Sequence, residues 1–271
     1  MSIHALFDRP VTCAPSIRAI DRPAHPSDRS ALLTIADPTT DTAPMPYARL
    51  ESALLQGLHQ KIHPDAPITA IAPDRADHAT VLQNLQIPHQ PHFHFTGHGI
   101  HDTQNPNRSA LQLTDTLLTT NTIAQLNLQH LDLAILAACE TAIVNPDQNL
   151  DYIGIQSAFL RAGVRNILST LWNIDEIAST WFTVHFYQQI LNDTKPAIAL
   201  TQTQHWMQTL TWATLAHWLT DLRQLPTLPS DPYDRLTARI SKILEKQDTI
   251  DTLTDYHHPY YWSAFVLTGG G

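Results

Sequence analysis

The chain has 271 residues, a net charge of −9 with its histidines neutral, 43% hydrophobic residues and 15% charged residues. This composition is ordinary for a globular protein with a substantial core, and the acidic balance argues against a nucleic-acid partner. Only two cysteines are present, Cys13 and Cys139, which are too few for a disulfide framework or a Cys-rich zinc site. A reducing, cytoplasmic setting is therefore expected.

Nothing in the sequence predicts export or a membrane partner. The first eight residues lack the basic segment and apolar run of a signal peptide. No apolar run approaches the length of about 18 residues that a membrane span needs.

The chain is expected to begin with an extended lead-in at 1–30, which holds four prolines, followed by a single domain at 31–271. Short apolar runs predict strands, and apolar residues three and four apart predict helices. In the first half of the chain, the expected elements are a strand at 31–36, a helix from Tyr47, a strand at 68–72, a helix at 76–85 and a strand at 93–96. A small β-excursion at 111–117, a helix at 120–126 with its cap at Thr120 and Asn121, and a strand at 131–137 follow. The second half is expected to contain a helix at 152–161, a strand at 166–172, helices at 176–192, 196–222 and 235–253, and a final strand at 261–267.

Strands that alternate with helices predict an α/β fold with a mostly parallel central sheet flanked by helices on both faces. In such sheets, reactive groups gather at the carboxyl ends of the strands. His98 follows one expected strand and Cys139 follows another. The pattern therefore predicts an imidazole beside a thiol at one edge of the sheet.

A histidine beside a cysteine is typical of nucleophilic catalysis. A thiol attacks carbonyls as the thiolate, so a neighbouring base is needed near neutral pH. His98 is the candidate general base, and Cys139 is the candidate nucleophile. The backbone amides of Gly99 and Cys139 are candidate oxyanion donors.

Other interpretations of the same residues stay open. A lone cysteine at the end of a strand is often a small core residue, and a lone histidine in a turn is often solvated or capping. A zinc site built from His92, His94, His98 and His101 is a further alternative, although no nearby carboxylate pattern completes it. We expect no metal and no cofactor.

Four segments, which follow one another in the order found in the family, together resemble the CHAT domain. This is a caspase-like, separase-related peptidase domain common in bacteria and often attached to tetratricopeptide repeats. The four segments are 94–99 (HFTGHG), 138–141 (ACET), 169–176 (STLWNIDE) and 258–265 (HPYYWSAF), and the early segments 36–38 (ADP) and 46–51 (PYARLE) are similar as well. The resemblance runs from about residue 15 to Gly269. It implies a caspase-like three-layer sandwich and a cysteine endopeptidase with His98 as base and Cys139 as nucleophile. It also implies a protein substrate or regulatory partner, including a repeat-containing protein, in a regulatory or defence pathway.

The sequence departs from the family pattern in two places. Ala142 and Ile143 replace the usual small residue and glycine after Cys-Glu-Thr, and 14–17 resembles a clipped remnant of the opening strand without upstream repeats. The alternative to a peptidase is therefore a catalytically silent CHAT module that binds a partner. An unrelated α/β hydrolase is disfavoured, because no Gly-x-Ser-x-Gly motif is present.

Three further residue groups have two interpretations each. Separase-like relatives prefer basic residues before the cut, so Asp175 is a candidate wall of the substrate pocket, and the alternative is an N-cap for the helix that follows. Asp151 and Gly154 resemble the acidic residue and the glycine that precede the next helix in the family, and their expected role is to cap that helix. Trp206, Trp212 and Trp218 are interpreted as helical core or partner-facing surface rather than a ligand box.

Overall fold

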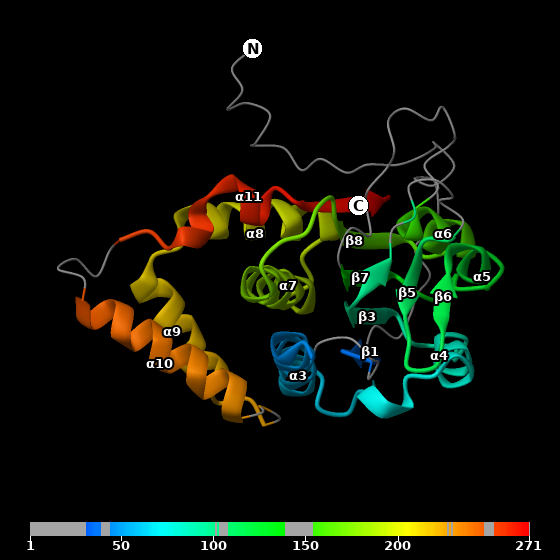
Figure 1. The fold of residues 1–271 in the computed structure, drawn as a ribbon, viewed down its shortest axis with the longest axis horizontal. Helices are drawn as coiled ribbons and strands as arrows, with labels where there is room; N and C mark the ends of the chain where they lie inside the picture. The colour runs from blue at the N-terminus through cyan, green and yellow to red at the C-terminus, as the bar shows by residue number, and fades with distance from the viewer. Residues whose placement is uncertain are drawn as a thin grey trace, which may run out of the picture.

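A computed structural model describes residues 31–38, 44–100, 102, 108–138, 154–226, 228, 230–246 and 252–270. The expected lead-in at 1–30 lies outside the described residues. Within the described ranges, strands and helices alternate and form three layers, as the sequence predicts (Figure 1). None of the helices in these ranges combines the length and the apolar composition that crossing a bilayer requires.

The middle layer is a six-stranded sheet with the order β2-β1-β3-β7-β8-β9. Its strands are β1 (Leu32–Ala36), β2 (Ile68–Ile71), β3 (His92–Gly97), β7 (Leu133–Ala138), β8 (Asn166–Thr170) and β9 (Phe265–Gly269). The first five run parallel, and β9 pairs antiparallel with β8 at one edge. The strands β1, β3 and β8 are buried along their whole length, because helices cover both faces of the sheet.

Helices from two parts of the chain cover the two faces (Figure 1). On one face lie α3 (Pro46–Ile62), α7 (Glu176–Leu191) and α8 (Pro196–Thr209), and on the other lie α4 (His78–Leu85), α5 (Thr120–Ala124) and α6 (Ile155–Ala162). Their buried side chains form two separate apolar clusters, one on each side of the sheet. The helices α3 and α7 pack against each other, although more than 100 residues separate them in the chain.

Strand β3 shows how the alternation of side chains divides the two faces. Phe93 and Phe95 belong to the apolar cluster on the side of α4 and α6. His92 and His94 point to the opposite face, where they meet side chains of α7 and α3. One face of this strand is therefore polar although it is buried.

A second, antiparallel sheet follows β3 and contains β4 (Gly99–Ile100), β5 (Ala110–Gln112) and β6 (Leu117–Thr119). This confirms the expected β-excursion. The two-residue strand β4 was not expected, because two residues are too few to show an alternating pattern. Helix α5 begins at Thr120 and ends at Ala124, with Thr119 as its N-cap. The N-cap therefore lies one residue before the expected position, and the helix ends two residues earlier than expected.

Three expected elements near the C-terminus differ from the structure. The stretch 196–222 is two helices, because the chain turns at Leu210 and Thr211 caps α9 (Trp212–Leu222). Helix α10 runs over Ser230–Lys246 instead of 235–253, since Pro232 lies in its first turn, where proline is tolerated. The final segment begins with the short helix α11 (Pro259–Trp262), and the strand starts only at Phe265.

The tryptophans of α8 and α9 pack into the protein, as expected. The rings of Trp206 and Trp218 lie 5.0 Å apart, and the His185 ring stacks on Trp206 at 4.2 Å. Trp212 is buried in the same apolar cluster. Trp262 is buried as well, and its indole N–H donates to the His257 carbonyl at 3.0 Å.

Phe182 of α7 is expected to be a principal anchor of the C-terminal strand. Its ring stacks on that of Phe265 with centroids 3.7 Å apart, and both side chains are buried. Phe182→Ala should lower the free energy of unfolding by about 3–5 kcal/mol, because a large cavity remains. Urea unfolding measures this loss, with the exposed His217→Ala as a control that should change it by less than about 0.5 kcal/mol. Equal effects of the two substitutions would contradict the packing described.

Candidate active site

His98 lies where β3 ends and β4 begins. Strand β3 ends at Gly97, and the carbonyl of His98 accepts a hydrogen bond from the Gln112 amide at 2.9 Å. The side chain of His98 is partly exposed. The residue is therefore held by its backbone at the carboxyl end of the central sheet, as the sequence predicts.

Gly97 allows the loop after β1 to lie close to this strand end. A side chain at position 97 would meet Pro38 Cδ at 3.1 Å and the Phe95 ring at 3.3 Å. The amide of Asp37 donates to the Thr96 carbonyl at 2.8 Å, which extends the β1–β3 pairing beyond the strands. The segment before His98 is thus packed between its neighbours and has little freedom to move.

Cys139 lies outside the described residues, and so do Cys13, His101, Asp151 and the Ala142–Ile143 pair. Strand β7 is described through Ala138, the residue before Cys139. Its register on β3 pairs Gly97 with Ala138. The two paired residues are followed directly by His98 and Cys139 in the sequence.

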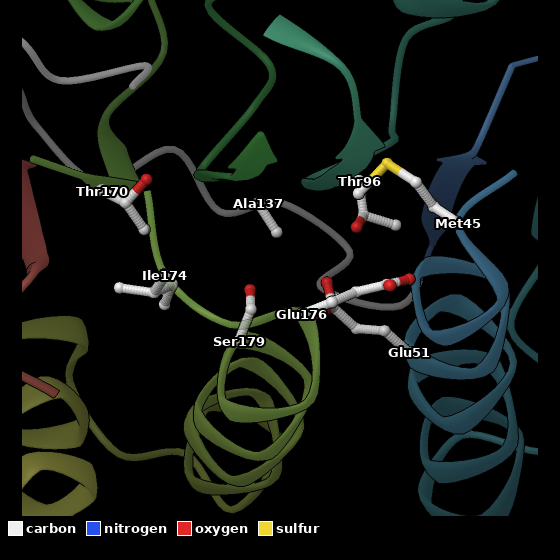
Figure 2. Close-up of a pocket in the computed structure, with 8 residues that line it drawn as sticks. All are labelled: Met45, Glu51, Thr96, Ala137, Thr170, Ile174, Glu176 and Ser179. Atoms are coloured by element: carbon white, nitrogen blue, oxygen red, sulfur yellow. The ribbon is translucent and has the colours of Figure 1, made fainter. Parts of the chain in front are cut away.

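A cavity of about 50 Å³ opens at this end of the sheet (Figure 2). Three neighbouring parallel strands contribute to it, and α3 and α7 form its other walls. Its lining residues are Met45, Glu51, Thr96, Ala137, Thr170, Ile174, Glu176 and Ser179. Figure 2 shows the side chains of Glu51 and Glu176 approaching each other from the two helices. The cavity therefore has two carboxylates in its lining, together with three hydroxyl groups and the apolar side chains of Met45, Ala137 and Ile174.

Asp175 is the N-cap of α7. Its Oδ1 accepts hydrogen bonds from the amides of Ile177 at 3.0 Å and Ala178 at 3.1 Å. This confirms the capping interpretation of Asp175. Its role in a substrate pocket stays a prediction, and the residue that lines the cavity is the next one, Glu176.

Glu176 joins the two helices at the cavity. Helix α3 has Met45 as its N-cap and no side-chain cap of its own, and Glu176 Oε1 accepts a hydrogen bond from the Ala48 amide at 2.8 Å. Partial burial raises the pKa of Glu176, and the nearby carboxylates of Glu51 and Asp37 raise it further. The hydrogen bond from α3 works in the opposite direction and lowers the pKa.

Glu51 and His94 form a buried pair beneath the cavity. His94 Nε2 lies 2.7 Å from Glu51 Oε1, and the two side chains are 0% and 1% exposed. Burial raises the pKa of Glu51, while the hydrogen bond and charge of His94 and hydrogen bonds with Thr96 and Thr180 lower it in part. The pair connects α3 to β3, the strand that ends directly before His98.

The other histidine of this face, His92, is part of a separate contact at the opposite end of β3. Its Nδ1 lies 3.1 Å from the Tyr187 hydroxyl, and the His59 Nδ1 lies 2.8 Å from the same oxygen. His92 and His94 thus face different partners instead of a common centre. The described residues contain no group of three or more His, Cys, Asp or Glu that could hold a metal ion.

Gly99 forms the antiparallel pair of β4 with Leu111 of β5. This pairing fixes the backbone directly after His98. The roles of the Gly99 and Cys139 amides as oxyanion donors stay predictions. Gly154 is the N-cap of α6, which agrees with the expected capping role. As a glycine, it makes no side-chain hydrogen bond to the helix.

Glu51 and His94 are the signal for the acidic cavity in the sequence. Glu51 lies four residues before Leu55 and seven before Leu58, which places it on the apolar stripe of α3. His94 likewise interrupts a buried strand. A buried Glu on one element requires a partner on another, but nothing local to either residue identifies that partner.

The comparisons with known proteins agree with this architecture. The CHAT domain family model matches residues 4–270. The chain belongs to the CHAT domain family. A comparison with curated protein sequences finds no match.

Solved structures of cysteine peptidases share the fold of this CHAT domain. The Arg-specific cysteine proteinase gingipain R of Porphyromonas gingivalis is similar with a TM-score of 0.51 and 11% identity, covering 89% of this chain and 46% of that one. Saccharomyces cerevisiae separase, in its complex with securin, is similar with a TM-score of 0.56 and 14% identity, covering 97% of this chain and 14% of that one. The CHAT chain therefore spans less than half of each relative. At these identities the likeness shows the caspase-like fold alone.

The cap assigned to Asp175 gives a direct prediction for stability. Asp175→Ala should lower the free energy of unfolding by about 1 kcal/mol, and Asp175→Asn by only a few tenths, because asparagine also caps helices well. Thermal and urea unfolding measure both variants. If alanine and asparagine had the same effect, the capping role would be wrong.

Proposed function

We propose that this CHAT domain is a cysteine endopeptidase in which Cys139 is the nucleophile and His98 is the general base. The expected substrate is a specific protein partner, cut at an exposed loop after a basic residue. The family, the caspase-like fold and the position of His98 support this proposal.

The observation that carries the proposal is the register of β3 on β7. Gly97 and Ala138 are paired across two parallel strands, and the next residues in the sequence are His98 and Cys139. Neighbouring strands lie about 4.8 Å apart, so residues that follow paired positions start within reach of each other. Proton transfer between an imidazole and a thiol requires such proximity.

The expected reaction follows from the two side chains. The imidazole of His98 takes the proton of the Cys139 thiol, and the thiolate attacks the peptide carbonyl carbon. Backbone amides, with Gly99 as the first candidate, stabilise the oxyanion of the tetrahedral intermediate. The imidazolium then gives its proton to the leaving amine. Water, deprotonated by the same imidazole, releases the acyl group from sulfur as a carboxylic acid.

The acidic cavity supports a basic residue before the cut. Glu51 and Glu176 line it at the carboxyl end of the strands that precede His98 and Cys139. A cationic side chain gains charge pairing with such a wall, whereas an aspartate would meet repulsion. The structural relative gingipain R is an Arg-specific proteinase.

A regulatory or defence role with one main partner follows from the family resemblance, and the structure of separase is that of a complex with securin. A repeat-containing protein is one candidate. The competing function is a catalytically silent module that binds a partner through the same edge. The Ala142–Ile143 departure directly after Cys-Glu-Thr favours this alternative.

A fluorogenic peptide panel with Arg, Lys, Met or Asp before the cut tests the proposal. The intact chain should cleave the Arg and Lys peptides, and Cys139→Ser and His98→Ala should each lower kcat/KM by at least about 100-fold, the size expected for loss of a positioned base. His217→Ala, an exposed histidine on α9, is the matched control and should retain full activity.

Each contrary outcome has a distinct meaning. Cleavage that persists in Cys139→Ser would eliminate the cysteine mechanism. A preference for Asp would contradict the role of the acidic cavity and of Asp175. No cleavage of any peptide, alone or with a repeat-containing partner, would favour the silent module.

A further inference from the structure

We propose that the groove between α9 and α10, together with a row of cations along α10, is a docking surface for an acidic helix of a partner protein. The cations, called the basic row below, are Arg235, Arg239, Lys242 and Lys246. None of the residues that line this groove lines the cavity at the carboxyl end of the central sheet. Binding at this surface does not require the chain to be a peptidase.

The helices α9 and α10 form an antiparallel hairpin that leaves the domain and returns to it at one point. Thr211 and Leu253 form an isolated antiparallel bridge at this point. Beside the bridge, the Thr254 amide donates to the Leu210 carbonyl at 2.8 Å. Figure 1 shows the hairpin beside the three layers, on the side away from α4 and α5. A partner can therefore contact the hairpin without any change in the central sheet.

The basic row lies along one face of α10. Its members are spaced by four, three and four residues, which places them on the same side of an α-helix, and all four are exposed. At a rise of about 1.5 Å per residue, the row is about 16 Å long. Residues 235–246 contain these four cations and one carboxylate, whereas the whole chain has a net charge of −9. The row is therefore a positive surface on an acidic protein.

Most of the charge of the basic row is not neutralised within the described part of the chain. Arg235 forms an ion pair with Asp231 through two contacts of 2.9 and 2.6 Å. No carboxylate of the described residues lies within ion-pair distance of Arg239, Lys242 or Lys246. On an ordinary solvated helix face, cations and carboxylates alternate and offset one another. Three neighbouring cations without such partners repel one another and favour an acidic ligand.

A groove of about 360 Å³ lies between α9 and α10. Leu219 and Ile240 contribute apolar groups to it, and its other walls include the small side chains of Ala216, Thr220, Ala238 and Ser241. Ala238 lies three residues after Arg235 and four before Lys242, so the groove and the basic row adjoin on the surface of α10. Small side chains on two neighbouring helices leave room for the side-chain ridge of a third helix.

Two contacts join α9 and α10 at the end of the groove nearest the hairpin loop. Arg223 Nη2 lies 3.3 Å from Asp234 Oδ1, and the buried Tyr233 hydroxyl donates to the Leu219 carbonyl. Burial raises the pKa of Tyr233 to about 12, so this hydroxyl remains a hydrogen-bond donor at neutral pH. The groove is thus formed before a partner binds. Its own charges are paired, so the charge of the partner is directed to the basic row.

The surface fits a protein helix better than nucleic acid or a membrane. Asp234 and Glu245 lie beside the basic row, where they would repel the continuous phosphates of a nucleic acid. A membrane surface binds helices whose large apolar side chains project outward, but Tyr233, Leu236 and Ile240 of α10 are buried. A helix with carboxylates spaced by four, three and four residues can pair with the basic row and place a ridge of uncharged side chains in the groove.

Two synthetic peptides of about 20 residues, long enough to form helices, test this surface. The first carries four glutamates spaced by four, three and four residues, with alanines and leucines on the adjoining face. The second has the same composition, but its glutamates are distributed around the helix. We expect the full chain to bind the first peptide about tenfold more tightly by fluorescence anisotropy, and more weakly at high salt. Equal affinities, or no binding of either peptide, would overturn the proposal.

The variant R239Q/K242Q/K246Q removes the unpaired cations of the basic row and should weaken binding of the first peptide about tenfold. The matched control variant replaces one arginine and two lysines that are exposed on other parts of the chain, Lys61, Arg75 and Lys195, with glutamine. It makes the same change in net charge and should leave the affinity unchanged. The same loss in both variants would show attraction by net charge alone and would contradict the docking surface.

The groove has its own test. Ala238→Trp fills the groove and should weaken binding of the first peptide about tenfold, whereas His217→Trp, at an exposed position of α9 outside the groove, should have no effect. Unchanged binding in Ala238→Trp would show that the groove takes no part. Duplex DNA and phosphatidylserine vesicles are the competing probes. Tighter binding of either probe than of the first peptide would overturn the assignment of a protein helix.

Discussion

The parallel pairing of β3 with β7 is the constraint on which the candidate site depends. It places Gly97 opposite Ala138 and thereby determines which residues follow at the same edge of the sheet. A shift by one residue would exchange the two faces of the strand. Phe93 and Phe95 would then point toward α3 and α7, and His92 and His94 would point into an apolar cluster. The packing of both faces therefore maintains the register.

The buried pair of Glu51 and His94 adds an electrostatic constraint to this register. A slipped strand would leave Glu51 without its partner, and an unpaired buried charge costs several kcal/mol. The same pair lies beneath the cavity beside His98. The register of β3 and the acidic character of the cavity therefore depend on the same pair. Glu176 extends this connection, because it caps α3 from α7 and lines the cavity as well.

The sequence was sufficient to predict the central sheet and the position of His98. Short apolar runs bounded by turn residues indicated the strands, and their alternation with helices indicated the parallel arrangement. The break at Leu210 could not be predicted, because an apolar residue there continues the helical pattern. The early start of α10 could not be predicted, because a proline usually interrupts a helical pattern, whereas Pro232 lies in the first turn, where proline is tolerated.

The cavity was harder to predict than the fold, for a physical reason. Glu51 and His94 lie 43 residues apart and meet only because α3 packs over β3. Asp175 and Glu176 are adjacent in the sequence, and only the direction of α7 decides that Asp175 caps the helix while Glu176 lines the cavity. Long-range packing thus determined roles that local patterns left open. The hypothesis about Ala142 and Ile143 concerns residues outside the described ranges and stays a prediction.

The rate at which iodoacetamide alkylates each cysteine, measured as a function of pH, tests the proposed dyad most directly. Peptide mass spectrometry reads Cys139 and Cys13 separately in the same sample, so Cys13 serves as an internal reference. A histidine-activated thiolate predicts that Cys139 reacts faster than Cys13 at slightly acid pH, and that His98→Ala removes this difference. Equal rates for the two cysteines, unchanged in His98→Ala, would contradict the dyad.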